Sequence, residues 1–340
     1  MTDAGAASLA AGAAFVGSVA LTPVAGLVAS RFSLLDHPDE SRPYKLQLQP
    51  VPYLGGLAIL LAIAVVYLSS GVVREVGSLA GAMILLALVG LFDDARGGLG
   101  VGTKLLLQAI AAAVAVVGGI QASVTGIAVL DQILTVFWLV AVTNAVNILD
   151  NCDGITSGSL LVGSVGAAAL AILQGQRLVG ILAAAVAGAA LGFLPYNFPR
   201  ARIYMGDIGT LPLGLLMATL ALKVDTKVEP PLNLVIPVSL LALPLINMLV
   251  VTIHRISAHQ PLYVGGLDGI WHRLVLLGYS RSQAVLLAVS VALLVAAVGV
   301  ASGQGLLPAS FGLLGVGAFS IWGLLLLRVP VAPMAAWKTP

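Results

Sequence analysis

Long apolar segments alternate with short polar stretches along the whole chain. Most of the segments approach the ~20 residues that an α-helix needs to cross a ~30 Å hydrocarbon core, although several are shorter. The alternation predicts an all-α, polytopic transmembrane bundle of ten or eleven helices, built as a single domain over residues 1–340. The predicted spans are Ala7–Ser30, Pro52–Ser69, Ser78–Phe92, Lys104–Ile120, Gln132–Leu149, Ile155–Leu173, Leu178–Leu194, Gly209–Leu222, Leu234–Ile253, Ser282–Ala301 and Leu306–Leu327.

Composition supports this class and excludes others. Hydrophobic residues make up 59% of the chain and charged residues 9%, and the mean hydropathy is +1.07, far from the values of soluble globular domains. The first segment is longer than the core of a signal peptide, so we expect a retained helix. The one cysteine, Cys152, excludes an intramolecular disulfide and offers no zinc-ligand spacing. The net charge is +2 and no basic stripe with interleaved aromatics occurs, so nothing indicates a nucleic-acid partner.

Five short, carboxylate-rich polar clusters all follow odd-numbered apolar segments, which places them on one face of a membrane bundle. Of the 16 Lys and Arg residues, all but Arg74, Arg177, Lys223 and Lys227 fall on that side. Because Lys and Arg favour the cytoplasmic side of short loops, we expect a cytoplasmic acidic face, an outside N-terminus and an inside C-terminus. Acids gathered at one surface suggest an active site, formed by loops at about residues 31–51, 93–104, 147–154, 197–209 and 254–281.

Asp93 and Asp94 end the third predicted helix. There the negative pole of the helix dipole disfavours an anionic side chain by up to ~1 kcal/mol. Local helix physics therefore does not explain the pair, and the plain alternative is a solvated helix end. Arg96 and Lys104 follow closely and are suited to holding phosphate.

Asn147, Asp150 and Asp153 are spaced three residues apart, so they share one side of a helix for as long as the helix continues. One amide and two carboxylates suit a hard cation such as Mg²⁺, which takes oxygen ligands and shares its shell with substrate phosphates. A simple helix end, with Gly154 as its left-handed stop, explains the glycine but not three polar groups in register.

Asp207 precedes an apolar helix and could be an ordinary N-cap. The string from Asn197 to Thr210 around it adds two arginines and two glycines, and a helix N-terminus offers free N–H groups to an anion. Together these groups suggest a nucleotide-diphosphate site. His272, beside Arg273, fits either a phosphate contact or a wet interface.

Taken together, these strings resemble the polyprenyl-phosphate N-acetylhexosamine-1-phosphate transferases, a multi-pass family that begins lipid-linked cell-envelope polysaccharides. The resemblance covers nearly the whole chain, and five motifs in the right order make it specific. They are Arg42 with Pro50-Val51-Pro52-Tyr53-Leu54-Gly55-Gly56, Asp93-Asp94 with Lys104, Asn144 to Gly154, Asn197 to Thr210, and His272-Arg273-Leu274 with Gly278-Tyr279-Ser280.

The resemblance implies that a phosphate oxygen of polyprenyl phosphate attacks the β-phosphorus of a UDP-linked N-acetylhexosamine, foremost N-acetylglucosamine, and that UMP leaves. It implies Mg²⁺ as cofactor with Mn²⁺ as a substitute, and a bacterial plasma-membrane location; a homodimer stays open. By residue-wise transfer, the implied roles are metal binding by Asp207, Asn147 and Asp150, catalysis by Asp93, Asp94, Asp150 and Asp153, and substrate binding by Lys45, Lys104, Asn197, Tyr204, Gly206, His272 and Arg273.

The chain also departs from the family's pattern. The triple-histidine segment of the muramyl-pentapeptide branch is absent, so the chain resembles the acetylglucosamine-phosphate branch. At four further places this chain carries a residue that differs from the one common in the family. Gln47 stands in place of a histidine, Asn151-Cys152 in place of a glycine followed by a hydrophobic residue, Asn247 in place of an aspartate, and Leu267 and Gly269 in place of a basic residue and a histidine.

Three other functions are alternatives. The altered histidine loop is compatible with a paralogue that lacks catalysis or uses another sugar. A transporter would use buried acids to carry protons or cations, but it predicts polar groups at mid-bilayer, whereas these lie at segment ends. A third candidate, an intramembrane prenyltransferase, lacks the expected Asp-x-x-x-Asp spacing after Asp93.

Overall fold

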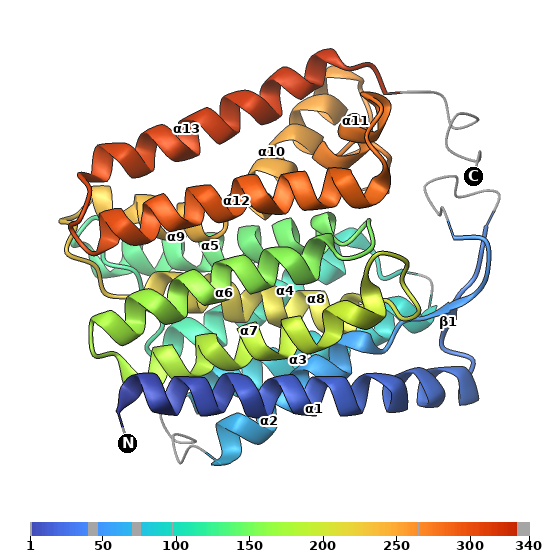
Figure 1. Ribbon diagram of the computed structural model, residues 1–340, viewed down its shortest axis with the longest axis horizontal. Helices are drawn as coiled ribbons and strands as arrows, with labels where there is room; N and C mark the ends of the chain where they lie inside the picture. The colour runs from blue at the N-terminus through green and yellow to red at the C-terminus, as the bar shows by residue number, and fades with distance from the viewer. Residues whose placement is uncertain (1, 40–46, 70–75, 97, 264, 332–340) are drawn as a thin grey trace.

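The fold is a bundle of helices, as Figure 1 shows, in a computed structural model that describes residues 2–39, 47–69, 76–96, 98–263 and 265–331. Among these residues, seven helices are long and apolar enough to cross a membrane, or eight if one bent pair is counted as a span. The prediction of an all-α polytopic bundle is therefore confirmed. The seven are α1 (Asp3–Arg31), α3 (Gly77–Arg96), α5 (Ala128–Leu149), α6 (Ile155–Leu173), α7 (Arg177–Asn197), α12 (Arg281–Gly303) and α13 (Ala309–Leu325).

Three shorter helices complete the bundle: α2 (Gly55–Ser69), α4 (Val101–Val117) and α8 (Asp207–Lys223). Helix α8 packs against α3 and α5 and is buried from Ile208 to Ala221. A helix that is apolar on all sides belongs in the interior, which explains why α8 sits at the centre of the bundle.

The ninth predicted span is broken into two helices. The short turn η1 (Leu232–Leu234) leads into α9 (Val235–Leu240), and α10 (Ala242–Ser257) leaves it at an angle of 87°. Between α10 and α12 lies a seven-residue helix, α11 (Ile270–Leu276), which the apolar pattern did not predict. The turn η2 (Leu326–Arg328) follows α13.

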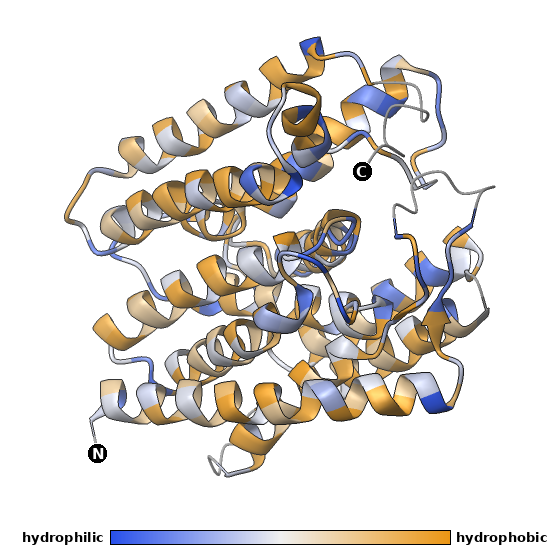
Figure 2. Ribbon diagram, turned by 45° about the vertical axis from the view of Figure 1, so that its right-hand side comes forward, coloured by the Kyte–Doolittle hydropathy of each residue, from blue (hydrophilic) through white to orange (hydrophobic). Residues whose placement is uncertain are grey.

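Polar segments from distant parts of the chain meet at one end of the bundle. Strands β1 (Leu35–Asp36) and β2 (Val51–Pro52) pair antiparallel there, and the backbone N–H of Tyr204 donates to the carbonyl of Pro52. Figure 2 shows hydrophilic residues near these strands and near α11, while the helices are largely hydrophobic along their length. The gathering of these segments agrees with the parity of the sequence pattern; the orientation of that end in the membrane stays a prediction.

Glycine contacts set how closely the central helices approach. A Cβ atom on Gly56 of α2 would lie 2.2 Å from the Cα of Gly209 in α8, and one on Gly90 of α3 would lie 2.2 Å from the carbonyl carbon of Asp207. Small residues permit such backbone contact between membrane helices. These contacts fix the start of α8 between α2 and the end of α3, where the acids lie.

Candidate active site

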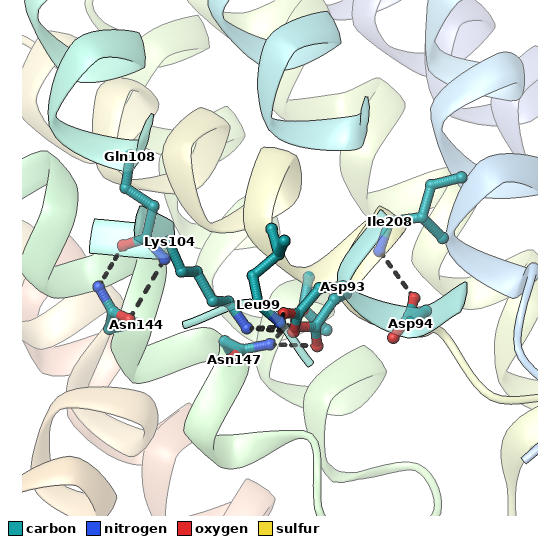
Figure 3. A network of polar contacts seen from close by, with 10 residues as sticks. Asp93, Asp94, Leu99, Lys104, Gln108, Asn144, Asn147 and Ile208 are labelled. Carbon is teal, nitrogen blue, oxygen red and sulfur yellow. Dashed lines mark hydrogen bonds and ion pairs between the residues drawn. The ribbon is translucent and has the colours of Figure 1, made fainter. Parts of the chain in front are cut away.

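Lys104 joins two of the predicted site aspartates. Its Nζ lies 2.9 Å from Oδ2 of Asp93, at the end of α3, and also forms an ion pair with Oδ2 of Asp207, the first residue of α8. The three side chains are only 14% to 21% exposed. Figure 3 shows Lys104 reaching from α4 toward Asp93 within this network. In this partly buried site, one ammonium group balances two carboxylates from other helices.

Asn147 completes the surroundings of Asp207. Its Nδ2 donates to Oδ1 of Asp207 over 2.6 Å and to Oγ1 of Thr210 over 2.9 Å. One helical turn earlier on α5, Asn144 exchanges hydrogen bonds with Gln108 of α4. This amide pair links α4 and α5 beside the carboxylates (Figure 3).

Asp94 points to a different place from Asp93. Its Oδ2 accepts from the backbone N–H of Ile208 at 3.3 Å, so it contacts the first turn of α8 (Figure 3). A carboxylate is stabilised there by the positive end of the helix dipole. The Asp93-Asp94 pair is therefore divided: Asp93 binds the lysine, and Asp94 binds the helix N-terminus.

Gly206 permits this arrangement. It has φ +70°, a conformation that side-chain-bearing residues rarely adopt, and a Cβ on it would lie 2.4 Å from the carbonyl oxygen of Tyr53 and 2.9 Å from Oδ2 of Asp94. The glycine predicted as a substrate-binding residue thus lies where Tyr53, Asp94 and α8 converge. Its contribution to substrate binding stays a prediction.

The turn between α5 and α6 carries Asp150 and Asp153. Helix α5 ends at Leu149, Asp150 is its C-cap, and Gly154 has φ +81°. The three-residue spacing predicted that Asp153 shares a helix face with Asn147 for as long as the helix continues. Because the helix ends at Leu149, Asp153 does not lie on that face. Its Oδ2 accepts instead from the backbone N–H of Ala201 at 3.0 Å.

Both carboxyl groups of this turn are poorly hydrated. Burial raises the pKa of Asp150 to about 7 and also raises the pKa of Asp153. The Asp150 carboxyl therefore exchanges its proton near neutral pH in the unliganded protein. A bound cation or a nearby positive charge would favour its ionised form.

Asn197 is a buried link between two predicted site segments. Its Oδ1 accepts from the N–H of Gly154 at 2.9 Å and from Oγ of Ser157 at 3.2 Å, and its Nδ2 donates to the carbonyl of Ile203 at 3.0 Å. The carbonyl of Tyr204 accepts from the N–H of Gly55 at 2.9 Å, and burial raises the pKa of the Tyr204 phenol. Asn197 holds the turn and the loop before α8 together.

The last predicted substrate-binding residues lie inside the protein. Arg273 is 1% exposed, and its Nη1 donates to the carbonyls of Leu326 and Val329 after α13, at 3.3 and 2.6 Å. Burial lowers the pKa of His272 well below its ordinary value, so its imidazole is neutral. In the state described, Arg273 anchors a helix; a direct phosphate contact by either residue stays a prediction. Lys45 lies outside the described residues.

Sequence reasoning missed two polar pairs. Gln108 and Asn144 form the first pair, and the sequence contained an indication of it, because each is an amide within an apolar segment. Gln108 lies four residues after Lys104, and Asn144 lies three residues before Asn147, so each shares a helix face with a predicted site residue. Trp271 and Asn151 form the second: the indole Nε1 donates to Oδ1 of Asn151 at 2.6 Å. Their separation of 120 residues left no sequence signal.

The oxygen-rich groups around Asp207 fit a cation shared with a substrate. Within the described ranges, no group of three or more His, Cys, Asp or Glu side chains is arranged to hold a metal ion. Mg²⁺ commonly binds through one or two carboxylates and completes its shell with water and substrate phosphates. The Asp207 carboxylate, with the side-chain amide of Asn147 2.6 Å away, matches that partial shell better than an all-protein cage.

Comparison with known proteins identifies the class. Residues 76–225 match the sequence family described as glycosyl transferase family 4. The chain is 32% identical over 278 residues to a protein of Bacillus subtilis (strain 168) named "Probable undecaprenyl-phosphate N-acetylglucosaminyl 1-phosphate transferase", covering 78% of this chain and 76% of that one. It is 30% identical over 352 residues to "Decaprenyl-phosphate N-acetylglucosaminephosphotransferase" of Mycobacterium leprae (strain TN), covering 89% and 85%.

A shorter similarity reaches another branch. Over 196 residues the chain is 32% identical to a "Phospho-N-acetylmuramoyl-pentapeptide-transferase" of Streptococcus pneumoniae (strain Taiwan19F-14), covering 52% of this chain and 60% of that one. This protein is thus a polytopic membrane transferase by fold and relationship. It belongs to glycosyl transferase family 4, and the resemblance read from its motifs is confirmed.

Proposed function

We propose that this protein transfers N-acetylglucosamine 1-phosphate from UDP-N-acetylglucosamine to a polyprenyl phosphate, releases UMP, and depends on Mg²⁺. One observation carries the proposal: Asp207, at the start of the buried helix α8, is met by Lys104 from α4 and Asn147 from α5. The names of the relatives that cover most of the chain point to the same sugar phosphate and to a polyprenyl acceptor.

The reaction joins two anions, so charge neutralisation is its main demand. An oxygen of the lipid phosphate forms a bond to the β-phosphorus of the donor, and the bond from that phosphorus to the bridging oxygen breaks. UMP leaves with this oxygen and its electron pair. Fixed cationic groups and dipoles aimed at the developing charge lower such a barrier. Lys104 and the N-terminus of α8 are the groups that the described residues place at Asp207.

The acids divide between the two substrates in this account. Asp93 and Asp94 end α3 and orient the lipid phosphate, and the carboxylate that Lys104 does not hold, Asp94, is available to accept its proton. Asp153 and Asn197 support the loop before α8, and this loop is proposed to bind the donor diphosphate. Asp150 lies on the turn after α5.

Asp207 is the proposed protein ligand of Mg²⁺, with Asn147 and Asp150 as further oxygen donors. Asn147 now donates its amide N–H to Asp207, so rotation of the amide would present its oxygen instead. When bound, the metal ion supplies positive charge to the pyrophosphate oxygens. Lys104 then keeps its contact with Asp93 and is free to move from Asp207 toward a phosphate.

The active end of the bundle is proposed to face the cytoplasm of a bacterial cell, where UDP-sugars occur. The support is the excess of Lys and Arg in the loops of that end. Burial raises the pKa of the thiol of Cys152, the one cysteine, so a cysteine at an exposed loop position is the better reporter: Arg200→Cys in a Cys152→Ser background. In sealed right-side-out vesicles, a membrane-impermeant thiol reagent should label this variant only after the membrane is opened; labelling of intact vesicles would reverse the orientation.

A donor panel tests the proposed chemistry. Purified protein in lipid discs, supplied with polyprenyl phosphate and Mg²⁺, should release UMP from UDP-N-acetylglucosamine at least tenfold faster than from UDP-N-acetylmuramoyl-pentapeptide, with the lipid product identified by mass spectrometry. The reverse preference would place the chain in the muramyl-pentapeptide branch. Folded protein that uses no UDP-sugar, yet carries ions across liposome membranes, would favour the transporter.

A further inference from the structure

The turn that carries Asp150 and Asp153 is tied to α11 by two side chains outside the proposed chemistry. Nε1 of Trp271 donates to Oδ1 of Asn151 at 2.6 Å. Asn151 lies directly after Asp150, and its side chain is exposed, so burial does not require this residue. A hydrogen bond between segments 120 residues apart fixes the distance between two loops that the helices leave separate.

Trp271 is a rigid end for such a link. It is 1% exposed, and its ring lies 3.7 Å from the ring of His272, centre to centre. The start of α11 is held from α10, because Oδ1 of Asn247 accepts from the N–H of Ile270 at 3.0 Å. A Cβ on Gly269 would lie 2.7 Å from the same Asn247 oxygen, so α11 and α10 are in close contact.

The middle of α11 is also anchored. The buried guanidinium of Arg273 donates to the carbonyls of Leu326 and Val329, and its Nε donates to the carbonyl of Asp268 at 3.2 Å. Asp268 in turn forms a buried ion pair with Arg255 of α10, 2.7 Å between Oδ2 and Nε. With the start and the middle of α11 fixed, the indole N–H of Trp271 is presented at a defined position.

The turn at the other end of the link has its own attachment to the loop before α8. Asp153 accepts from Ala201, and Gly154 donates to Asn197. These two bonds hold the second half of the turn, whereas Asn151 lies in the first half, next to Asp150. Without a partner for Asn151, the first half would depend on the end of α5 for its position, where Asp150 has already left the helix.

We infer that Trp271 is a positioning residue, which through its hydrogen bond to Asn151 holds the Asp150–Asp153 turn in the geometry that binds the donor UDP-sugar. The inference rests on the proposed function, in which this turn and the loop before α8 form the donor side of the site. A tether of this kind sets donor affinity and leaves the lipid-phosphate side, at Asp93 and Asp94, unchanged.

A double-mutant cycle tests the tether. Trp271→Phe keeps an aromatic ring and removes the N–H donor; Asn151→Ala removes the acceptor at an exposed position. Each single variant should raise both the KM and the Kd for UDP-N-acetylglucosamine about tenfold, the equivalent of ~1.4 kcal/mol and the usual size of a lost hydrogen bond. The KM for polyprenyl phosphate should stay within about twofold. The double variant should match the singles.

Trp138→Phe is the matched control. The indole of Trp138, in α5, donates to the carbonyl of Ala218 in α8 at 3.1 Å, so this change also removes one tryptophan hydrogen bond inside the bundle. It should leave both KM values near the parental ones. Melting temperatures of all variants in lipid discs show whether the bundle stays folded.

Three results would overturn the tether: single variants with parental donor KM and Kd, a double variant whose losses multiply to about a hundredfold, or equal rises in both KM values. These failures are distinct from a failure of the proposed function. In that case the parental protein itself would neither bind UDP-N-acetylglucosamine nor release UMP.

Discussion

Gly90→Ala tests how closely α3 must approach the start of α8. The added Cβ would lie 2.2 Å from the carbonyl carbon and oxygen of Asp207 and 2.4 Å from the nitrogen of Ile208. Ordinary contact begins at 3.4 Å, so the two backbones must separate by at least 3.4 − 2.2 = 1.2 Å. That movement would carry Asp93 away from Asp207, because Asp93 lies one helical turn after Gly90.

The expected effect on turnover follows from this displacement. Misplacing reacting groups by ~1 Å costs on the order of 100-fold in rate. Stability should change less, because overpacking costs about 1–3 kcal/mol and replacing a helical glycine by alanine returns about 1 kcal/mol. The rate of UMP release and the melting temperature, both measured in lipid discs, separate the two effects.

Gly81→Ala is the control for this prediction. Gly81 lies on the same helix, and a Cβ there would meet nothing within 4 Å. It should keep the parental rate. The reasoning is refuted if Gly90→Ala turns over as fast as Gly81→Ala, since the helices would then tolerate the separation without loss of the site.

Three further predictions concern the polar groups. Asp207→Ala should lower kcat by at least about 10³-fold, the scale of losing an electrostatic group at a transition state. The control Asp225→Ala, beyond the far end of α8, should leave kcat unchanged. Equal rates in the two variants would refute the proposed role of Asp207. Lys104→Gln should cost about 100-fold in kcat, with partial recovery in Lys104→Arg, because two carboxylates lose the cation between them; parental kcat in Lys104→Gln would contradict this. The pKa of Asp150 near 7 means that the folded protein binds a proton there between about pH 4 and 7 and the unfolded chain does not. The free energy of unfolding in EDTA should therefore fall as pH rises through that window, and Asp150→Asn should flatten the curve; identical slopes would contradict the burial of this carboxyl.

The helices could be predicted from the sequence, since apolar length alone marks a membrane span. Each of the eleven predicted segments coincides with a helix, but the ninth is broken. Leu234–Ile253 reads as one apolar run, and its 87° bend at Leu241 depends on how α9 and α10 pack in the bundle. Helix α11 was hidden for the opposite reason, because seven residues in a polar loop produce no periodic signal.

The sequence predicted which residues belong to the candidate site, but it did not predict which of them contact one another. The acids stood out because local structure did not explain them. The pairing of Lys104 with Asp207 spans 103 residues and follows only from the packing of both α4 and α8 against α3 and α5. Arg273 shows the reverse case: a cation beside a histidine suggested phosphate, while burial turns its guanidinium toward backbone carbonyls.

The central claim is that lipid phosphate, donor and metal ion meet at Asp207. The direct measurement is UMP release by the purified protein in lipid discs with UDP-N-acetylglucosamine, comparing the complete mixture with mixtures that lack polyprenyl phosphate or contain EDTA. The account predicts one UMP for each lipid-linked sugar phosphate formed, and none when either the lipid or the metal is withheld. UMP release that continues without the lipid acceptor, or in EDTA, would contradict it.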